Sequence, residues 1–214
     1  MEQLELLRSP RAGVLTSEVK ENRKHKCLTR KTKRIMAVID FITKGQPMPN
    51  YIKDFEAPCG AVHSWQNLKI DYVTQYGYTY VPYCHNNINY AELNAQHPDA
   101  VSSRFSGCLM VAFEKKNGGI FAGHVQTEKD RKPYDCRDLW EAELHNFSRF
   151  FAFRPSIILN PSPSDVMALN CYGFLVFEND FNKLTAFAVS TDANNIVSKR
   201  EEIFSGDFAG RIEL

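Results

Sequence analysis

Two side chains that together could form and break an acyl bond lie sixteen residues apart near the middle of the chain. Cys108 follows Gly107, and His124 lies within the apolar run Ile120–Val125. A thiol becomes a strong nucleophile when it loses its proton, and a neighbouring imidazole can take that proton and stabilise the thiolate. The glycine lets backbone N–H groups approach the sulfur, as an oxyanion pocket requires. These residue types predict a cysteine nucleophile with a histidine base.

A β-hairpin is predicted to bring the two side chains together. Strand-like runs flank Lys116–Gly118, a sequence that favours a three-residue loop with glycine in the left-handed region. Counting back from this loop places Met110 opposite His124. Cys108 then lies on the same face of the sheet as His124, as a diagonal neighbour about 7–8 Å away along the backbone. A register shifted by one residue would place the two side chains on opposite faces.

The same residues also fit a purely structural role. Unpaired cysteines are among the most buried residues, and a strand histidine is often a hydrogen-bonded part of a core. Cys84 and His85 form another cysteine–histidine combination, but adjacent residues of a strand point to opposite faces. A structural role for Cys108 and His124 therefore stays open, and both rank above the adjacent pair as catalytic candidates.

The sequence around this cysteine resembles that of the cysteine–histidine glutamine deamidases. Phe105–Cys108 is similar to the hydrophobic-Ser-Gly-Cys element of that family, which includes the catalytic domain of the cytotoxic necrotizing factors, a lethal-factor deamidase toxin and the chemotaxis receptor deamidase. In these proteins a histidine follows in a neighbouring strand, as His124 does here. Some members carry a threonine six positions before the cysteine that orients the histidine; this chain has Ser102 there, beside Ser103. The resemblance covers residues 100–127.

The resemblance implies a reaction and a role for each residue. Cys108 would attack the carboxamide of a protein glutamine, and His124 would carry its proton to the leaving ammonia. Backbone N–H groups of Gly107 and Cys108 would stabilise the oxyanion, and the thioester would be hydrolysed without metal or cofactor. Ser102 is expected to orient His124, with Ser103 or a backbone carbonyl as alternatives. The family also implies a β-sandwich flanked by helices.

The biological setting is likewise an expectation drawn from the resemblance. It implies a hydrolase that acts as a bacterial toxin or effector in virulence, with a host protein such as a GTPase or a translation factor as substrate. Residues 1–10 carry acids and lack the positive charge and apolar run of a Sec signal peptide. We therefore expect a protein made in the bacterial cytoplasm and secreted into the host cytosol without a Sec signal. We also expect it to be a monomer.

Two other functions fit the sequence. The Cys108–His124 pair could catalyse peptide cleavage or transglutamination, which pass through the same kind of thioester. Alternatively, the chain is a non-enzymatic binding protein that works through residues 20–34, where eight basic side chains accompany one acidic side chain. Such a segment also predicts contact with an anionic membrane. Reaction products separate the enzymatic readings, and the reactivity of the thiol separates them from the binding protein.

The overall composition fits a globular protein with one sizeable core. The chain has 214 residues, of which 43% are hydrophobic and 24% are charged, as is ordinary for one folded domain. Because the net charge is only +1, we do not expect the whole molecule to bind nucleic acid. The six cysteines are scattered without metal-binding spacing, which predicts reduced thiols and no metal site.

The pattern of apolar residues and turn formers divides the chain into an arm and a domain. Residues 1–28 are predicted to form a flexible basic N-terminal arm, and residues 29–214 a single catalytic domain. A helix is expected at about 32–44, ended by Gly45 and Pro47.

Strand patterns dominate the rest of the domain. Strands are expected within 61–83, in the hairpin at 101–127, and at 169–178 and 184–191. A short helix is predicted at 90–96, and a longer one from about Asp138 to Phe151, where Leu139, Trp140, Leu144, Phe147 and Phe151 recur at helical spacing. The predicted fold class is α+β, with a strand-rich mixed or antiparallel sheet or a β-sandwich flanked by helices.

Overall fold

The computed structural model describes a folded unit that begins after Ala37. The described residues, all within Val38–Leu214, are 42–48, 64–67, 70–71, 78–127, 136–159 and 171–214. The predicted arm 1–28, the basic segment 20–34 and most of the helix predicted at 32–44 lie outside them. In this described part of the chain no helix has the length and hydropathy needed to cross a bilayer.

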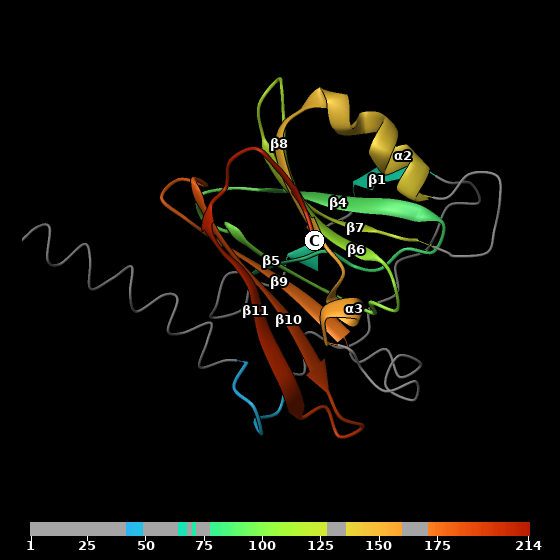
Figure 1. The fold of residues 1–214 in the computed structure, drawn as a ribbon, viewed down its shortest axis with the longest axis vertical. Helices are drawn as coiled ribbons and strands as arrows, with labels where there is room; N and C mark the ends of the chain where they lie inside the picture. Colours follow the sequence, from blue (N-terminus) through green and yellow to red (C-terminus); the bar gives the residue numbers. More distant parts are fainter. Residues whose placement is uncertain (1–41, 49–63, 68–69, 72–77, 128–135, 160–170) are drawn as a thin grey trace, which may run out of the picture. The chain divides into compact units, whose positions relative to one another are not determined.

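The described residues form two mixed β-sheets of six strands each (Figure 1). In order across the first sheet, the strands are β1 (Ser64–Asn67), β4 (Asn87–Leu93), β7 (Ile120–Val125), β6 (Leu109–Lys115), β8 (Phe147–Phe153) and β12 (Arg211–Glu213). In order across the second sheet, they are β11 (Val197–Asp207), β10 (Lys183–Thr191), β9 (Cys171–Glu178), β5 (Asp99–Ser103), β3 (Tyr78–Tyr80) and β2 (Ile70–Asp71). The predicted strand-rich α+β fold is confirmed.

The two sheets share a core that fills the space between their inner faces. One buried cluster contains Met110 and Ala112 of the first sheet together with Leu175 and Ala186 of the second. Met110 of β6 packs tightly against β9, because a Cβ atom on Gly173 would lie 3.0 Å from Cγ of Met110. The space at position 173, beside the strand that follows Cys108, therefore favours glycine.

The outer face of the first sheet is covered by α2 (Cys136–Glu143), a short helix whose Trp140 is fully buried. The Trp140 ring packs against Phe113, with centroids 5.6 Å apart, and against Trp65, with centroids 6.2 Å apart. A 3-10 turn, η2 (Leu144–Asn146), follows α2, and α3 (Pro155–Leu159) follows β8.

The helix predicted to continue to Phe151 is wrong beyond Glu143, because β8 begins at Phe147. β8 lies between β6 and β12 and is buried on both faces: Phe150 contributes to the outer cluster and Phe151 to the core between the sheets. A strand that is buried on both faces shows no alternation of apolar and polar residues, so its phenylalanines matched helical spacing by chance.

The helix predicted at 90–96 is also wrong, because most of this segment belongs to β4. Ile88 faces the outer cluster, whereas Ala91 and Leu93 face the core between the sheets. This period of two is typical of a strand, and pairing with β1 and β7 on either side overrides the local helical preference of these residues.

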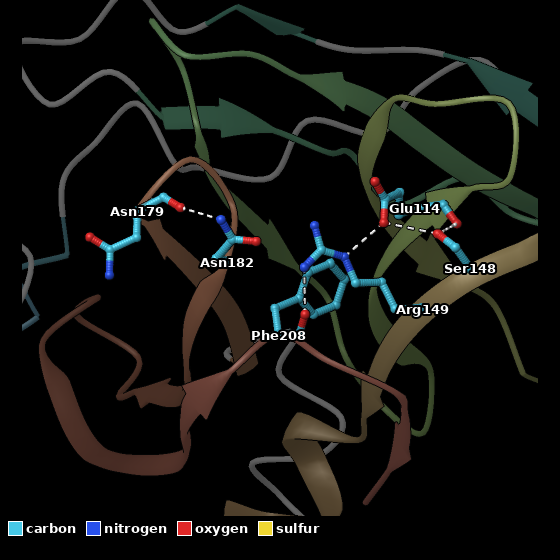
Figure 2. Close-up of polar contacts among 6 residues, drawn as sticks. All are labelled: Glu114, Ser148, Arg149, Asn179, Asn182 and Phe208. Atoms are coloured by element: carbon cyan, nitrogen blue, oxygen red, sulfur yellow. Dashed lines mark hydrogen bonds and ion pairs between the residues drawn. The ribbon is translucent and has the colours of Figure 1, made fainter.

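Arg149 of β8 ties one end of the first sheet to the segment between β11 and β12 (Figure 2). Its Nε atom lies 2.8 Å from Oε2 of Glu114, and its Nη1 atom donates a 2.6 Å hydrogen bond to the carbonyl of Phe208. The guanidinium also lies 4.6 Å from the centroid of the Phe208 ring. The Phe208 N–H donates to the carbonyl of Asn182, so the same cluster reaches the turn between β9 and β10.

Candidate active site

The hairpin formed by β6 and β7 determines which side chains share the inner face of the first sheet. The Lys115 N–H donates to Gly119, and the Gly118 N–H donates to Lys115 at 2.9 Å. Gly118 has a φ of +95°, which suits glycine far better than other residues. From this turn the ladder runs back to Met110, which lies directly opposite His124. The predicted register of the hairpin is confirmed.

Cys108 lies immediately before β6, two residues from Met110. Its side chain belongs to the same buried cluster between the sheets as that of Met110, and only 3% of the residue is exposed. Because side chains two residues apart share a face, Cys108 lies on the face that also carries His124. Four described cysteines, Cys84, Cys108, Cys136 and Cys171, form no disulfide bond.

Ser102 of β5 reaches His124 from the opposite sheet. The Oγ atom of Ser102 lies 2.8 Å from Nδ1 of His124, and both residues are buried. The neighbouring Ser103 has a different partner, because its Oγ atom lies 2.7 Å from the hydroxyl of Tyr80. Of the two serines considered from the sequence, the structure brings Ser102 to the histidine.

Two aromatic rings hold the imidazole of His124 in place. The Phe105 ring stacks on it almost in parallel, with centroids 4.3 Å apart and an interplanar angle of 7°. The Tyr83 ring meets it edge to face, with centroids 5.4 Å apart. Ser102 and these two rings fix the position and the plane of the imidazole.

Burial sets the charge of His124. It lowers the pKa of the imidazole from 6.5 to about 3, so the ring is neutral at neutral pH. Its Nε2 atom is buried without a hydrogen-bond partner among the described residues. When Nδ1 donates its proton to Ser102, Nε2 carries the lone pair that a general base needs. The imidazole on this face of the sheet is therefore uncharged at rest.

The loop between β5 and β6 delivers Cys108 to this face. Arg104 and Gly107 have φ values of +67° and +140°, so the loop makes two sharp changes of direction. The Oγ1 atom of Thr127 donates a 2.6 Å hydrogen bond to the carbonyl of Gly107. Thr127 was not singled out from the sequence, because a lone threonine beyond a strand gives no signal of such a contact.

A second histidine lies close to the site. His85 Nδ1 is 3.1 Å from Nε2 of Gln126 and 3.2 Å from the hydroxyl of Tyr83. Gln126 lies two residues after His124, and its Oε1 atom accepts a hydrogen bond from the Asn86 N–H. His85 therefore joins a polar network beside the imidazole. In the described residues no group of three or more His, Cys, Asp and Glu side chains could hold a metal ion.

Comparisons with solved structures give a distant structural likeness. No protein-family model and no curated protein matches the sequence. The chain is similar to the crystal structure of the C-terminal domain of CNFy from Yersinia pseudotuberculosis, with a TM-score of 0.33 and 13% sequence identity. The match covers 61% of this chain and 62% of that chain, which is less than two thirds of the solved domain.

Proposed function

We propose that this protein is a protein-glutamine deamidase in which Cys108 is the nucleophile and His124 the base. The observation that supports it best is the buried hydrogen bond between Ser102 and His124, on the sheet face shared with Cys108. This bond orients an imidazole whose Nε2 atom is buried without a partner in the described part of the chain. An unpaired buried nitrogen costs stability, and chemistry at that nitrogen would account for its retention.

In the first half of the proposed reaction, Sγ of Cys108 attacks the carboxamide carbon of a glutamine side chain. The thiol proton passes to Nε2 of His124, and backbone N–H groups at Gly107 and Cys108 stabilise the oxyanion. The carbon–nitrogen bond then breaks. His124 gives the proton to the leaving nitrogen, so that ammonia departs and a thioester to Cys108 remains.

Water completes the reaction. His124 takes a proton from a water molecule, whose oxygen attacks the thioester carbon, and the proton returns to the departing sulfur. The net change replaces a neutral carboxamide by a carboxylate and releases ammonia. The target protein gains one negative charge at neutral pH, which is enough to disrupt a contact of that side chain with a partner.

The low pKa of His124 is compatible with a role as base. An imidazolium alone in this site is unfavourable because burial penalises the charge. The thiolate formed at Cys108 would supply the missing opposite charge on the same face of the sheet. The imidazolium would then form only together with this thiolate, during attack, whereas the imidazole is neutral at rest.

The biological role that goes with this reaction is that of a bacterial effector acting on a host protein. The motif around Cys108 and the basic segment 20–34 support it. That segment would contact the anionic inner face of a host membrane, because clustered basic residues bind anionic lipid surfaces. Co-sedimentation with vesicles that contain phosphatidylserine tests this part: equal binding by the chain without residues 1–34 would contradict it.

The experiment that tests the reaction compares proteins of a eukaryotic cell lysate after exposure to wild type and to Cys108→Ala. Peptide mass spectrometry should find glutamines converted to glutamate with wild type only. Cys136→Ala is the matched control, since Cys136 is equally buried but lies in the cluster on the outer face of the first sheet. Deamidation by Cys108→Ala at the wild-type level would end the proposal.

The same spectra separate the alternative reactions of the pair. A protease would leave cut backbones, and a transglutaminase would leave amine adducts on glutamine. If no lysate protein changes and Cys108 labels with iodoacetamide no faster than Cys136, the non-enzymatic binding protein becomes the better reading.

A further inference from the structure

The peptide group between Gly107 and Cys108 is held by a residue from a different part of the chain. The Oγ1 atom of Thr127 donates to the Gly107 carbonyl oxygen at 2.6 Å. Gly107 has a φ of +140°, which side chains rarely allow, although a Cβ atom there would meet only Oγ1 of Thr127, at 4.0 Å. Backbone conformation, not lack of space, therefore requires glycine at 107.

This contact determines more than the position of one oxygen. A peptide group is planar and trans, so the carbonyl of Gly107 and the N–H of Cys108 point in opposite directions. A hydroxyl that holds the oxygen therefore also sets the direction of the Cys108 N–H and the position of the Cys108 Cα. The first is a proposed oxyanion donor, and the second carries the proposed nucleophile.

We infer that Thr127 is a positioning residue for acyl transfer by Cys108. The inference rests on the proposed function. Thr127 acts through the Gly107 carbonyl and touches no reacting atom. Oxyanion stabilisation depends on the direction of its donors, because they must point at the place where negative charge develops. Loss of the hydroxyl frees the peptide to rotate about φ of Cys108 and ψ of Gly107, so the donor and the sulfur lose their alignment.

The test uses a small chromogenic probe, the γ-4-nitrophenyl ester of N-acetylglutamic acid α-amide. Attack by Cys108 forms the sulfur–carbon bond of the same γ-glutamyl thioester and breaks the ester bond to 4-nitrophenolate, while the thiol proton passes to His124. The released 4-nitrophenolate is measured by its absorbance. The full chain is compared as wild type, Thr127→Val, Thr127→Ser and Cys108→Ala. Thr127→Val removes the donor and keeps the shape of the side chain, and Thr127→Ser keeps the donor.

We expect Thr127→Val to lower the acylation rate constant by about tenfold or more, with KM for the ester unchanged; removal of a whole oxyanion donor costs about 10²–10³. Thr127→Ser should restore the rate to within about threefold of wild type, because its hydroxyl can make the same bond. Thr185→Val is the matched control, since Thr185 Oγ1 also bonds a partner, Ser205, but on β10 of the second sheet. It should leave acylation unchanged.

The outcomes separate this inference from the proposed function. If wild type releases 4-nitrophenolate no faster than Cys108→Ala, the proposed function fails. If wild type is faster and Thr127→Val equals it, Thr127 has no positioning role. Failure of Thr127→Ser to restore the rate would also overturn the inference, because the hydroxyl would not be the cause. Should Thr127→Val not fold by circular dichroism, Thr127→Ala and Thr127→Ser provide the same comparison.

Discussion

Ser102 and His124 form a hydrogen bond of 2.8 Å between two strands of different sheets, β5 and β7. The serine is the only hydrogen-bond partner of the imidazole among the described residues, because Nε2 has none. This one contact therefore holds the imidazole in its position, and it also links the two sheets at the site.

Ser102→Ala should lower both the activity and the stability of the protein. Without the hydroxyl, Nδ1 loses its buried partner, which should cost about 1–3 kcal/mol in the free energy of unfolding by urea. The same loss leaves the ring free to turn within the site, so turnover of the nitrophenyl ester should fall about tenfold or more. Ser102→Thr keeps the hydroxyl and should retain most of the turnover and most of the stability.

Ser103→Ala is the matched control for that change. It removes an equally buried hydroxyl, bonded to Tyr80 at 2.7 Å, from the neighbouring position of the same strand. It should reduce stability by a similar amount and leave turnover close to wild type. Equal losses of turnover in the two alanine variants would show that Ser102 has no special relation to the imidazole.

Acid should destabilise the protein through His124. Burial lowers the pKa of this residue to about 3 in the folded chain, whereas an unfolded chain has the ordinary value of about 6.5. The unfolded state therefore binds a proton between these values that the folded state does not. This contribution to stability is fully present above pH 6.5, and it falls by up to about 1.4 kcal/mol for each pH unit below it.

Urea unfolding at pH 7, 6, 5 and 4 measures this dependence. His124→Phe is the comparison, because a phenyl ring can stack on Phe105 as the imidazole does and carries no titrating group. Carboxylates contribute equally to both proteins, so the difference between the two curves reports His124. Parallel curves over this range would mean that the imidazole is not held neutral in the folded chain.

Arg149→Met should destabilise the fold without touching the candidate site. The change removes the ion pair with Glu114 and the hydrogen bond to the Phe208 carbonyl (Figure 2). Because both side chains of the pair are partly shielded from water, we expect a loss of about 2 kcal/mol in urea unfolding. Glu141→Gln, in an exposed pair with Arg137, should change it by less than about 0.5 kcal/mol. Equal effects would contradict a stabilising role for Arg149.

Asp180→Gly should stabilise the protein. Asn179, Asp180 and Phe181 have φ values of 50°, 54° and 63° in the turn between β9 and β10. A left-handed conformation costs an L-residue about 1–2 kcal/mol, less for Asn and Asp, and glycine adopts it without that cost. We expect a gain of about 0.5 kcal/mol or more, because the greater freedom of glycine in the unfolded chain offsets part of the relief.

Asn117→Gly provides the opposite comparison in the other hairpin. Asn117 is not among the residues with positive φ, so glycine there adds freedom to the unfolded chain and relieves no strain. The melting temperature should fall in this variant and rise in Asp180→Gly. A fall in both would show that the turn between β9 and β10 is not strained.

The hairpin register could be predicted from the sequence because local chemistry determines it. The glycines after Asn117 allow one kind of tight turn, and the alternation of side chains then fixes that Met110 faces His124. The same reasoning placed Cys108 on the face of His124. What it could not provide was the partner strand, because β5 belongs to the other sheet and its contact with His124 crosses the core.

The two errors in the secondary structure predicted from the sequence have a common cause. Local preference favoured helices around Ala91 and Phe151, but both residues lie in strands with a neighbouring strand on each side. The secondary structure of such segments depends on pairing with strands that are distant in the sequence. A short stretch of sequence carries no information about that pairing. Thr127 escaped notice for a related reason, since its bond to Gly107 spans twenty residues.

The burial of the site also bears on access and therefore on kinetics. Cys108 is 3% exposed and His124 is 1% exposed, so the proposed reaction requires a form of the protein in which both side chains are more exposed. The apparent affinity for a target then falls in proportion to the open fraction: a protein that is open about one hundredth of the time binds about a hundredfold more weakly than its open form. A target that itself stabilises the open form removes this penalty, so the burial of the pair would select for the correct protein and protect the thiol from other electrophiles.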